Sequence, residues 1–411
     1  MIDSQDVSEQ ELEVLRGDAV GDNLCSSKWI INTLMSLCEV DKRGWTEELE
    51  DQLCTLWDLS MEGEVASHLM SYDFPKIAKD TLVVSSEPRL TEMMLGIIGN
   101  VCCNDEAVDK IGRDRELVAQ ILSHLASGDS LILIQLIRIL QIVAWKIRQD
   151  HQSHWVAHLT ECEFFGDSIT FMLKSSTNDD LLIGAIKLLE SISEIGPLNE
   201  SSFLEKLCKI DDLIPALLES FTQVISTRKT SGHIEWTFAQ HWLAVLIAVI
   251  ESGSLKFDDY ETDERFSKLM EIMYRILKPY RQSYNLYPLQ RLSASMIYDA
   301  ARVLLGFHRC DVNVPTRIDR IIATIIFFLK VKTVSESGSE TEVDPEGLRA
   351  ELLDYLSKYW SQIIGFCTSE QIAEILCERE VRECLINLMQ SDPEVTPEAL
   401  DKVKKAAVEK S

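Results

Sequence analysis

Glycine and proline are scarce in this chain, with 17 glycines and 10 prolines among 411 residues. Together they make up about half of the usual share of ~12%. So few turn-forming residues predict long helices and weigh against β-sandwiches, β-barrels and collagen-like structures. The apolar fraction of 46% is large enough for a real core and excludes global disorder. We therefore expect an all-α fold.

Long uncharged apolar runs are missing too. The apolar stretches 131–137, 236–250 and 321–329 fall short of the ~18 residues of a membrane span, so no span is predicted. The acidic start, MIDSQDVSEQELEV, is not typical of a secretory signal. The eleven cysteines include no CxxC pair, which favours reduced thiols and a location in the nucleus or cytoplasm.

Catalytic signatures are also lacking: the sequence contains no GxSxG, HExxH, EF-hand or kinase motif. We therefore predict neither an enzyme nor a cofactor.

Apolar residues recur instead at the helical spacing i, i+3, i+4, i+7 through most of the chain. This spacing predicts helices over residues 88–103, 115–126, 129–146, 179–195, 233–250, 288–307, 315–331, 348–366 and 369–389.

Similar apolar motifs return along these predicted helices. IIGNVCC, ILQIVAW, KLLESIS, VLIAVIE and ARVLLGF follow one another at intervals of 42, 48, 58 and 56 residues. The first intervals are near the ~40–47 residues of HEAT and armadillo repeats, and the later ones are longer. We predict an armadillo/HEAT-like α-solenoid with irregular C-terminal repeats; the alternative is an irregular helical bundle. The solenoid should cover residues 23–390, between an acidic flexible N-terminus (1–22) and a polar tail or capping helix (391–411), with a disordered acidic loop at 334–347.

Negative charge dominates, with 67 acidic and 40 basic residues and a formal net charge of −27. Residues 266–332 alone are basic, with eleven Lys or Arg and four acids. An acidic surface attracts basic partners and repels nucleic acid, so we expect a protein partner, with basic ones favoured, and no direct nucleic acid binding.

The best metal candidate is the segment HQSHWVAHLTEC. One helical face could present His151, His154 and His158, with Cys162 one turn later. Zinc usually takes ligands from more than one element, and Trp155 indicates ordinary packing. We favour surface or partly buried histidines and predict no metal site.

A basic aromatic segment spans residues 278–291. Interleaved cations and rings of this kind can stack on bases or bind an acidic or phosphorylated peptide. The alternative is a loop between two helices whose tyrosines close the end of the core. The residues concerned are Lys278, Tyr280, Arg281, Tyr284, Tyr287 and Arg291.

Four blocks carry a resemblance to a known family: Lys28 with Trp29, and residues 56–75, 88–103 and 167–182. In these blocks the chain resembles the serum amyloid A-like protein family, over roughly residues 25–195. The resemblance implies a non-enzymatic armadillo-type protein associated with the nucleus and with promotion of cell proliferation.

The leading hypothesis is therefore an adaptor that holds a partner on the inner surface of the solenoid. In armadillo repeats the third helix of each unit lines that surface, here 88–103, 129–146, 179–193 and 233–250. The predicted groove residues are Glu92, Asn100, Gln135, Arg138 and Glu190. Asn100 is expected to clamp a partner's backbone, because its amide offers both a donor and an acceptor. Replacing Asn100 and Arg138 should then abolish capture of the partner without changing the melting temperature.

Two other functions compete with this hypothesis. The first is a nuclear transport receptor or adaptor for basic cargo, although Ile142 and Glu190 occupy the places where Asn100 would have to repeat. The second is a metal-binding or enzymatic protein that uses His151, His154 and His158.

Overall fold

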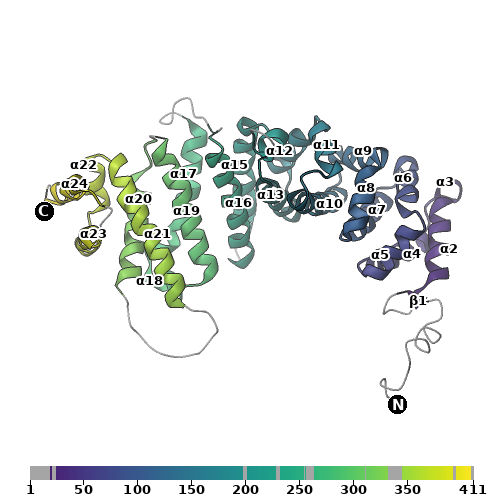
Figure 1. Cartoon of the computed structure of the whole chain (residues 1–411), viewed down its shortest axis with the longest axis horizontal. Helices are drawn as coiled ribbons and strands as arrows, with labels where there is room; N and C mark the ends of the chain where they lie inside the picture. Colours follow the sequence, from purple (N-terminus) through teal and green to yellow (C-terminus); the bar gives the residue numbers. More distant parts are fainter. Residues whose placement is uncertain are drawn as a thin grey trace, which may run out of the picture. The chain divides into compact units, whose positions relative to one another are not determined.

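The computed structural model describes residues 19–20, 25–197, 201–227, 232–253, 255, 263–310, 312–331, 345–391 and 395–408. These residues are almost entirely helical (Figure 1). Within this part of the chain, one short antiparallel pair joins β1 (Ala19–Val20) to β2 (Cys25–Ser26). The all-α fold is confirmed. The chain divides into two compact units, Met1–Lys209 and Ile210–Ser411.

Unit 1 consists of consecutive helices joined by short connections. They are α2 (Ser27–Cys38), α3 (Val40–Arg43), α4 (Glu47–Leu59), α5 (Gly63–Ser71), α6 (Phe74–Val84), α7 (Pro88–Val101), α8 (Asp105–Arg113), α9 (Arg115–Ser123), η1 (His124–Ala126), α10 (Ser130–Gln149), α11 (His154–Glu161), α12 (Phe165–Ser175), α13 (Asp179–Ser193) and α14 (Phe203–Leu207).

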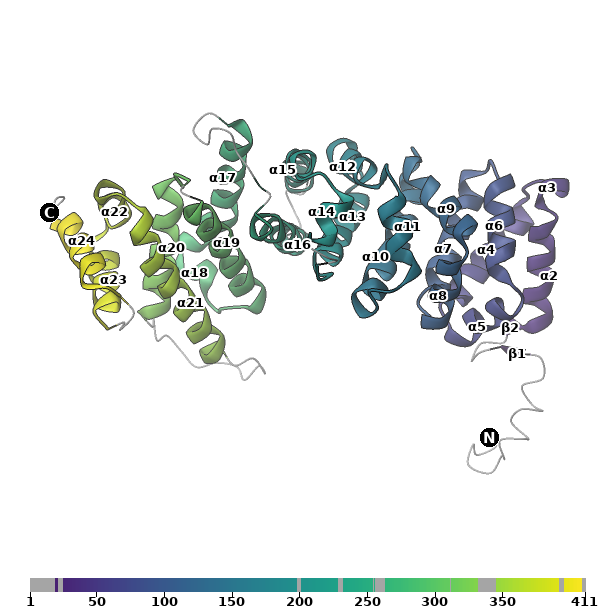
Figure 2. The same cartoon turned by 45° about the horizontal axis from the view of Figure 1, so that its top comes forward.

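The helices of unit 1 pack in rows whose successive members are three or four helices apart along the chain (Figure 2). One row runs α4, α7, α10 and α13, and each member contacts the next. A second row runs α2, α6 and α9, continuing through η1 to α12, and a third joins α8, α11 and α14. Each row buries apolar side chains that a single helix could not bury alone.

Local sequence explains where these helices begin. Asn104, Asp114, Asp129 and Asn178 precede α8, α9, α10 and α13, and each side chain accepts hydrogen bonds from backbone N–H groups of the first turn. Such caps are worth about 1 kcal/mol each.

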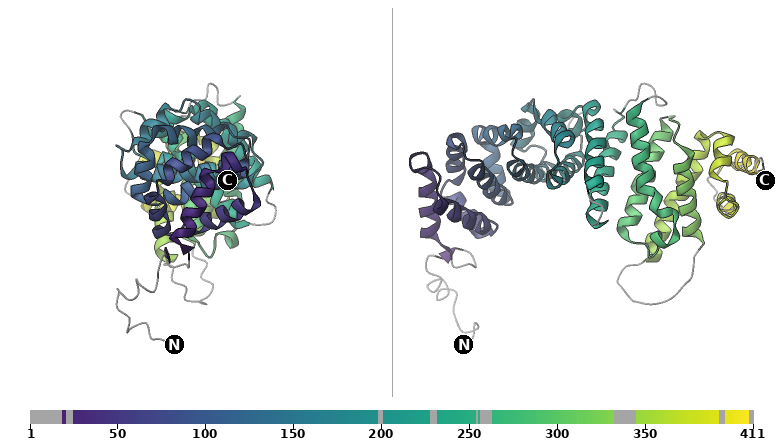
Figure 3. Two further views of the ribbon diagram at one scale, coloured as in Figure 1. Left: turned by 90° about the vertical axis from the view of Figure 1, so that its right-hand side faces the viewer. Right: turned by 180° about the vertical axis from the view of Figure 1, so that it is seen from behind.

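Unit 2 is also a set of helices packed side by side (green to yellow in Figure 3). It contains α15 (Ile210–Thr227), α16 (Gly232–Glu251), α17 (Glu264–Leu277), η2 (Lys278–Arg281), α18 (Ser283–Leu286), α19 (Arg291–Arg309), α20 (Thr316–Lys330), α21 (Pro345–Phe366), α22 (Ser369–Ile375), α23 (Arg379–Ser391) and α24 (Pro397–Val408). The helices α16, α19 and α21 form one row, and α15, α17 and α20 form another.

Three sequence predictions for unit 2 need correction. The helix predicted over 369–389 is two helices, because α22 ends at Ile375 and α23 begins at Arg379. The helix predicted from 288 begins at Arg291. The predicted acidic loop ends too late, because α21 already starts at Pro345, a residue suited to a first helical turn.

The terminal predictions have mixed outcomes. The segment predicted as a polar tail or a capping helix contains α24, which buries Val403 and Ala406 against α21–α23. Residues 1–18, 21–22 and 334–344, predicted to be flexible or disordered, lie outside the described residues.

One helix in the described part of the chain, α10, is long and apolar enough to cross a membrane by length and composition alone. Half of its most apolar window is buried, and it packs against α7 on one side and α13 on the other. These are the contacts of a core helix. The cysteines from Cys38 to Cys384 are free thiols.

Candidate partner-binding surface

A partly apolar face of α10 remains accessible in unit 1. We call it the α10 stripe: Leu131, Ile134, Gln135, Arg138, Ile142 and Trp145, which recur at helical spacing. Leu131 is 49% exposed and Trp145 is 52% exposed, whereas the opposite face of α10 is buried. An exposed tryptophan beside aliphatic side chains is typical of a protein-binding surface.

Next to the stripe, α7 is covered completely. Every residue from Leu90 to Val101 is buried. On one side, the indole of Trp57 from α4 lies directly on Gly96, where any added Cβ atom would overlap the ring. The lack of a side chain at Gly96 therefore lets α4 close over α7.

Arg89 holds the start of α7 to α4. Its guanidinium lies 6.0 Å from the centre of the Trp57 ring and donates to Glu50 at 3.1 Å and Glu92 at 2.7 Å. The pKa of Arg89 is raised above its usual value, chiefly by its hydrogen bond to Glu92. Glu92 is therefore buried and paired, and the prediction that it faces a groove is wrong.

The structure also corrects the role predicted for Asn100. This residue is only 4% exposed, and its amide is already used inside unit 1. Its Nδ2 donates to the Trp57 carbonyl and to the Ser60 hydroxyl, both at 2.9 Å, while its Oδ1 accepts from Arg138 of α10. Asn100 joins α4, α7 and α10 and has no amide group left for a partner.

The other predicted groove residues are partly accessible. Gln135 and Arg138 lie on the α10 stripe, and Glu190 is half-buried on α13. Among the described atoms, Gln135 Oε1 has no hydrogen-bond partner. Sequence analysis missed the exposure of Ile134, Ile142 and Trp145, because apolar residues all round α10 gave no sign of which face would stay open.

Charge around the stripe is mixed. On α10, Lys146 pairs with Asp109 of α8 at 3.1 Å, and Arg148 pairs with Glu194 just after α13. Unit 1 as a whole carries 36 acidic and 17 basic residues, a net charge of −19. A partner with both basic and apolar side chains would complement this surface.

The three histidines do not share a helical face. His151 lies in a turn before α11, so only His154 and His158 belong to that helix. The ring of His158 is hydrogen-bonded to the Gly112 carbonyl at 2.9 Å, and Trp155 donates to the Val108 carbonyl at 3.0 Å. Within the part of the chain that the structure describes, no group of three His, Cys, Asp or Glu side chains could hold a metal ion.

The basic aromatic segment offers a single exposed ring. Tyr280 is buried against Trp236, Tyr287 donates to the Phe328 carbonyl at 2.9 Å, and Tyr284 is 73% exposed. Tyr280 and Tyr287 therefore cannot serve in a stacking platform, and for these two residues the other interpretation, tyrosines that close the end of the core, is the one that holds. Lys278, Arg281 and Arg291 are exposed, as predicted.

Comparison with known proteins gives a consistent set of relatives. The chain is 28% identical over 268 residues to the protein SAAL1 of Homo sapiens, covering 58% of this chain and 55% of that protein. It is 27% identical over 250 residues to SAAL1 of Mus musculus (53% and 52%), and 31% identical over 192 residues to saal1 of Xenopus tropicalis (44% and 41%).

These relatives are serum amyloid A-like 1 proteins. The sequence resemblance to that group is thereby confirmed for about half of the chain, and the chain spans about half the length of the curated relatives it matches. No protein-family model matches the chain.

Similarity to solved structures is weak. An engineered protein matches with a TM-score of 0.35 at 13% identity, covering 92% of this chain and 98% of that one. A chain from a study of a phosphorylation switch between cadherin and beta-catenin matches with a TM-score of 0.42 at 10% identity (93% and 91%).

Proposed function

We propose that this protein is a non-enzymatic adaptor of the armadillo type, which binds a polypeptide partner along the α10 stripe of unit 1. The observation that carries the proposal is the exposure of Trp145 and Leu131 on a helix that is otherwise packed between α7 and α13. Burying such side chains against a partner would gain about 25 cal/mol per Å² of apolar surface.

The three-row packing of unit 1 supports the armadillo-type interpretation. Armadillo repeats contain three helices and about 40–47 residues. In unit 1, α7, α10 and α13 start 42 and 49 residues apart, and each is preceded by two shorter helices.

The proposed partner has basic and apolar side chains, in keeping with the charge of −19 on unit 1. The similarity to relatives named SAAL1 is compatible with an adaptor role. From the resemblance to the serum amyloid A-like family, the same proposal includes a location in the nucleus or cytoplasm and a role in promoting cell proliferation. The transport-adaptor alternative has less support, because the amide of Asn100 already binds Trp57, Ser60 and Arg138.

Site-specific photo-crosslinking tests this proposal. A photoreactive amino acid at Trp145 should crosslink to a defined partner in cells, and Trp145→Glu should abolish that complex with the purified partner. Phe171 of α12 is the matched control, since it is an aromatic residue 68% exposed on another helix row. Crosslinking to the same partner with equal yield from both positions would contradict the proposed surface.

A further inference from the structure

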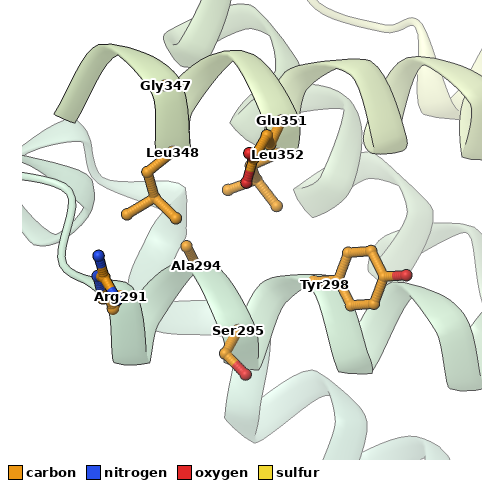
Figure 4. Close-up of a pocket in the computed structure, with 8 residues that line it drawn as sticks. All are labelled: Arg291, Ala294, Ser295, Tyr298, Gly347, Leu348, Glu351 and Leu352. Carbon is orange, nitrogen blue, oxygen red and sulfur yellow. The ribbon is translucent and has the colours of Figure 1, made fainter. Parts of the chain in front are cut away.

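A second candidate site lies in unit 2, between the first turns of α19 and α21. A cavity of about 520 Å³ is lined by Arg291, Ala294, Ser295 and Tyr298 on α19 and by Gly347, Leu348, Glu351 and Leu352 on α21. Figure 4 shows the two sets of side chains facing one another. The cavity therefore has one cationic side chain, one carboxylate and an aliphatic wall between them.

Among the described residues, the cation of this cavity forms no ion pair, even with Glu351, which lines the same cavity. Arg291 is exposed and makes no ion pair with any described acidic residue. It is the first residue of α19, where a positive charge is unfavourable to the helix, and no acidic residue stands in that first turn. An anionic ligand would relieve this local conflict.

Two more unpaired cations precede the cavity in the chain. Lys278 and Arg281 of η2 are exposed, and no described carboxylate pairs with either. The segment that carries them lies near the start of α21: Tyr287 donates to the Phe328 carbonyl, and while burial raises the pKa of Tyr287, the nearby guanidinium of Arg349 opposes that rise. The cations thus belong to the most basic part of an otherwise acidic chain, residues 266–332.

We propose that the cavity between α19 and α21 binds an acidic peptide segment of a protein partner. In this complex a carboxylate of the peptide pairs with Arg291, and a neighbouring aliphatic side chain enters the cavity against Ala294, Leu348 and Leu352. Glu351, which also lines the cavity and has no described ion-pair partner, accepts hydrogen bonds from backbone N–H groups of the peptide.

The same residues disfavour other anions. A dianionic phosphate would bring two negative charges into the cavity that already holds Glu351, whereas a carboxylate brings one. Single-stranded nucleic acid needs accessible rings for stacking, and Tyr280 and Tyr287 are engaged in the core. A carboxylate-bearing peptide is the ligand that the charges and the aliphatic wall both fit.

Fluorescence anisotropy of the full chain with a short fluorescein-labelled peptide of alternating glutamate and leucine tests this site. Saturable binding is expected, and Arg291→Glu should weaken it about tenfold or more. Lys404→Glu is the matched control, because this exposed lysine of α24 makes the same charge change outside the cavity. Its affinity should equal that of the wild type.

Two further arms test the aliphatic contact and the ligand class. Leu348→Ser, or serine in place of leucine in the peptide, should weaken binding several-fold. A lack of saturable binding, equal affinity of the Arg291→Glu and wild-type proteins, or tighter binding of an oligouridylate RNA would each overturn the proposal. Thermal melting of every variant checks that unit 2 is still folded.

Discussion

The side-chain amide of Asn100 on α7 accepts a hydrogen bond from the guanidinium of Arg138 on α10. The same amide donates to the backbone of Trp57 and to Ser60, so one buried side chain links α4, α7 and α10, which are neighbours in one row of unit 1. Arg138 is thereby held in place on the α10 stripe. Asn100 acts on the proposed surface by positioning Arg138 rather than by contacting a partner.

Asn100→Ala should lower the free energy of unfolding by about 1–3 kcal/mol, because it leaves buried donors and acceptors unpaired. Chemical denaturation measures this loss. Gln149→Ala, at the exposed end of α10, is the control and should change stability by less than about 0.5 kcal/mol. Unchanged stability of the Asn100 variant would restore the original prediction that this residue is free to bind a partner.

Gly96→Ala should destabilise unit 1 by about 1–3 kcal/mol, because the added methyl group would collide with the Trp57 indole. In a chain that already carries Trp57→Ala, the Gly96→Ala substitution should cost much less stability, because the ring it collides with is gone. A double-mutant cycle measures this difference. Gly365→Ala is the control, since nothing lies within 4 Å of its Cβ position and alanine favours helix. Strict additivity of the two substitutions would argue against the contact.

Tyr359→Phe should destabilise unit 2 by about 1.5–3 kcal/mol. The Tyr359 hydroxyl donates to Asp319 at 2.5 Å, and both side chains are fully buried, with His308 at 3.3 Å from the same carboxylate. A hydrogen bond to a buried charged group is among the stronger ones. Burial, and then the charge of Asp319, raise the pKa of Tyr359 well above its usual value, so this hydroxyl stays a donor at neutral pH.

The control for this variant is Tyr284→Phe, which removes a hydroxyl from an exposed ring. Its midpoint of urea denaturation should match that of the wild type. If both variants unfold at the same urea concentration as the wild type, the Tyr359–Asp319 bond contributes nothing to stability.

Acidification should destabilise unit 1 through His124. Burial lowers the pKa of His124 below its usual 6.5, and its Nε2 has no hydrogen-bond partner in the described structure. The unfolded chain therefore binds the proton more readily than the folded chain. The free energy of unfolding should fall as the pH drops below 6.5, and this contribution should level off below the folded-state pKa.

The measurement is denaturation of wild type and His124→Gln from pH 7.5 down to pH 5. Below pH 6.5, the free energy of unfolding of His124→Gln should fall less steeply with decreasing pH than that of the wild type. His154→Gln, which changes an exposed histidine, should show the same pH dependence as the wild type. Identical slopes in all three proteins would show that His124 is protonated equally in both states.

Much of the helical layout follows from local sequence, and the predictions for it succeeded for local reasons. The structure shows side-chain caps at Asp129 and Asn178 and a proline at the start of α7, and each acts within a single turn of chain. The break between α22 and α23 was missed because the apolar spacing continues across it.

The candidate surface was predicted less well. The sequence predicts that Glu92 and Asn100 face a groove, because they lie on the helix that lines the inner surface of an armadillo unit. Their partners, Arg89 together with Trp57, Ser60 and Arg138, bury them instead. Three of those four partners lie about forty residues away in the sequence, beyond the reach of a helical pattern.

The sequence by itself determined the all-helical class, the positions of most helix starts and the strongly acidic character, because each depends on composition or on one turn of chain. Only the tertiary structure decided which face of α10 stays open and where the amide of Asn100 is used. A helix that is apolar on nearly every side has no inner or outer face until its neighbours pack against it, and here α7 and α13 leave Trp145 exposed.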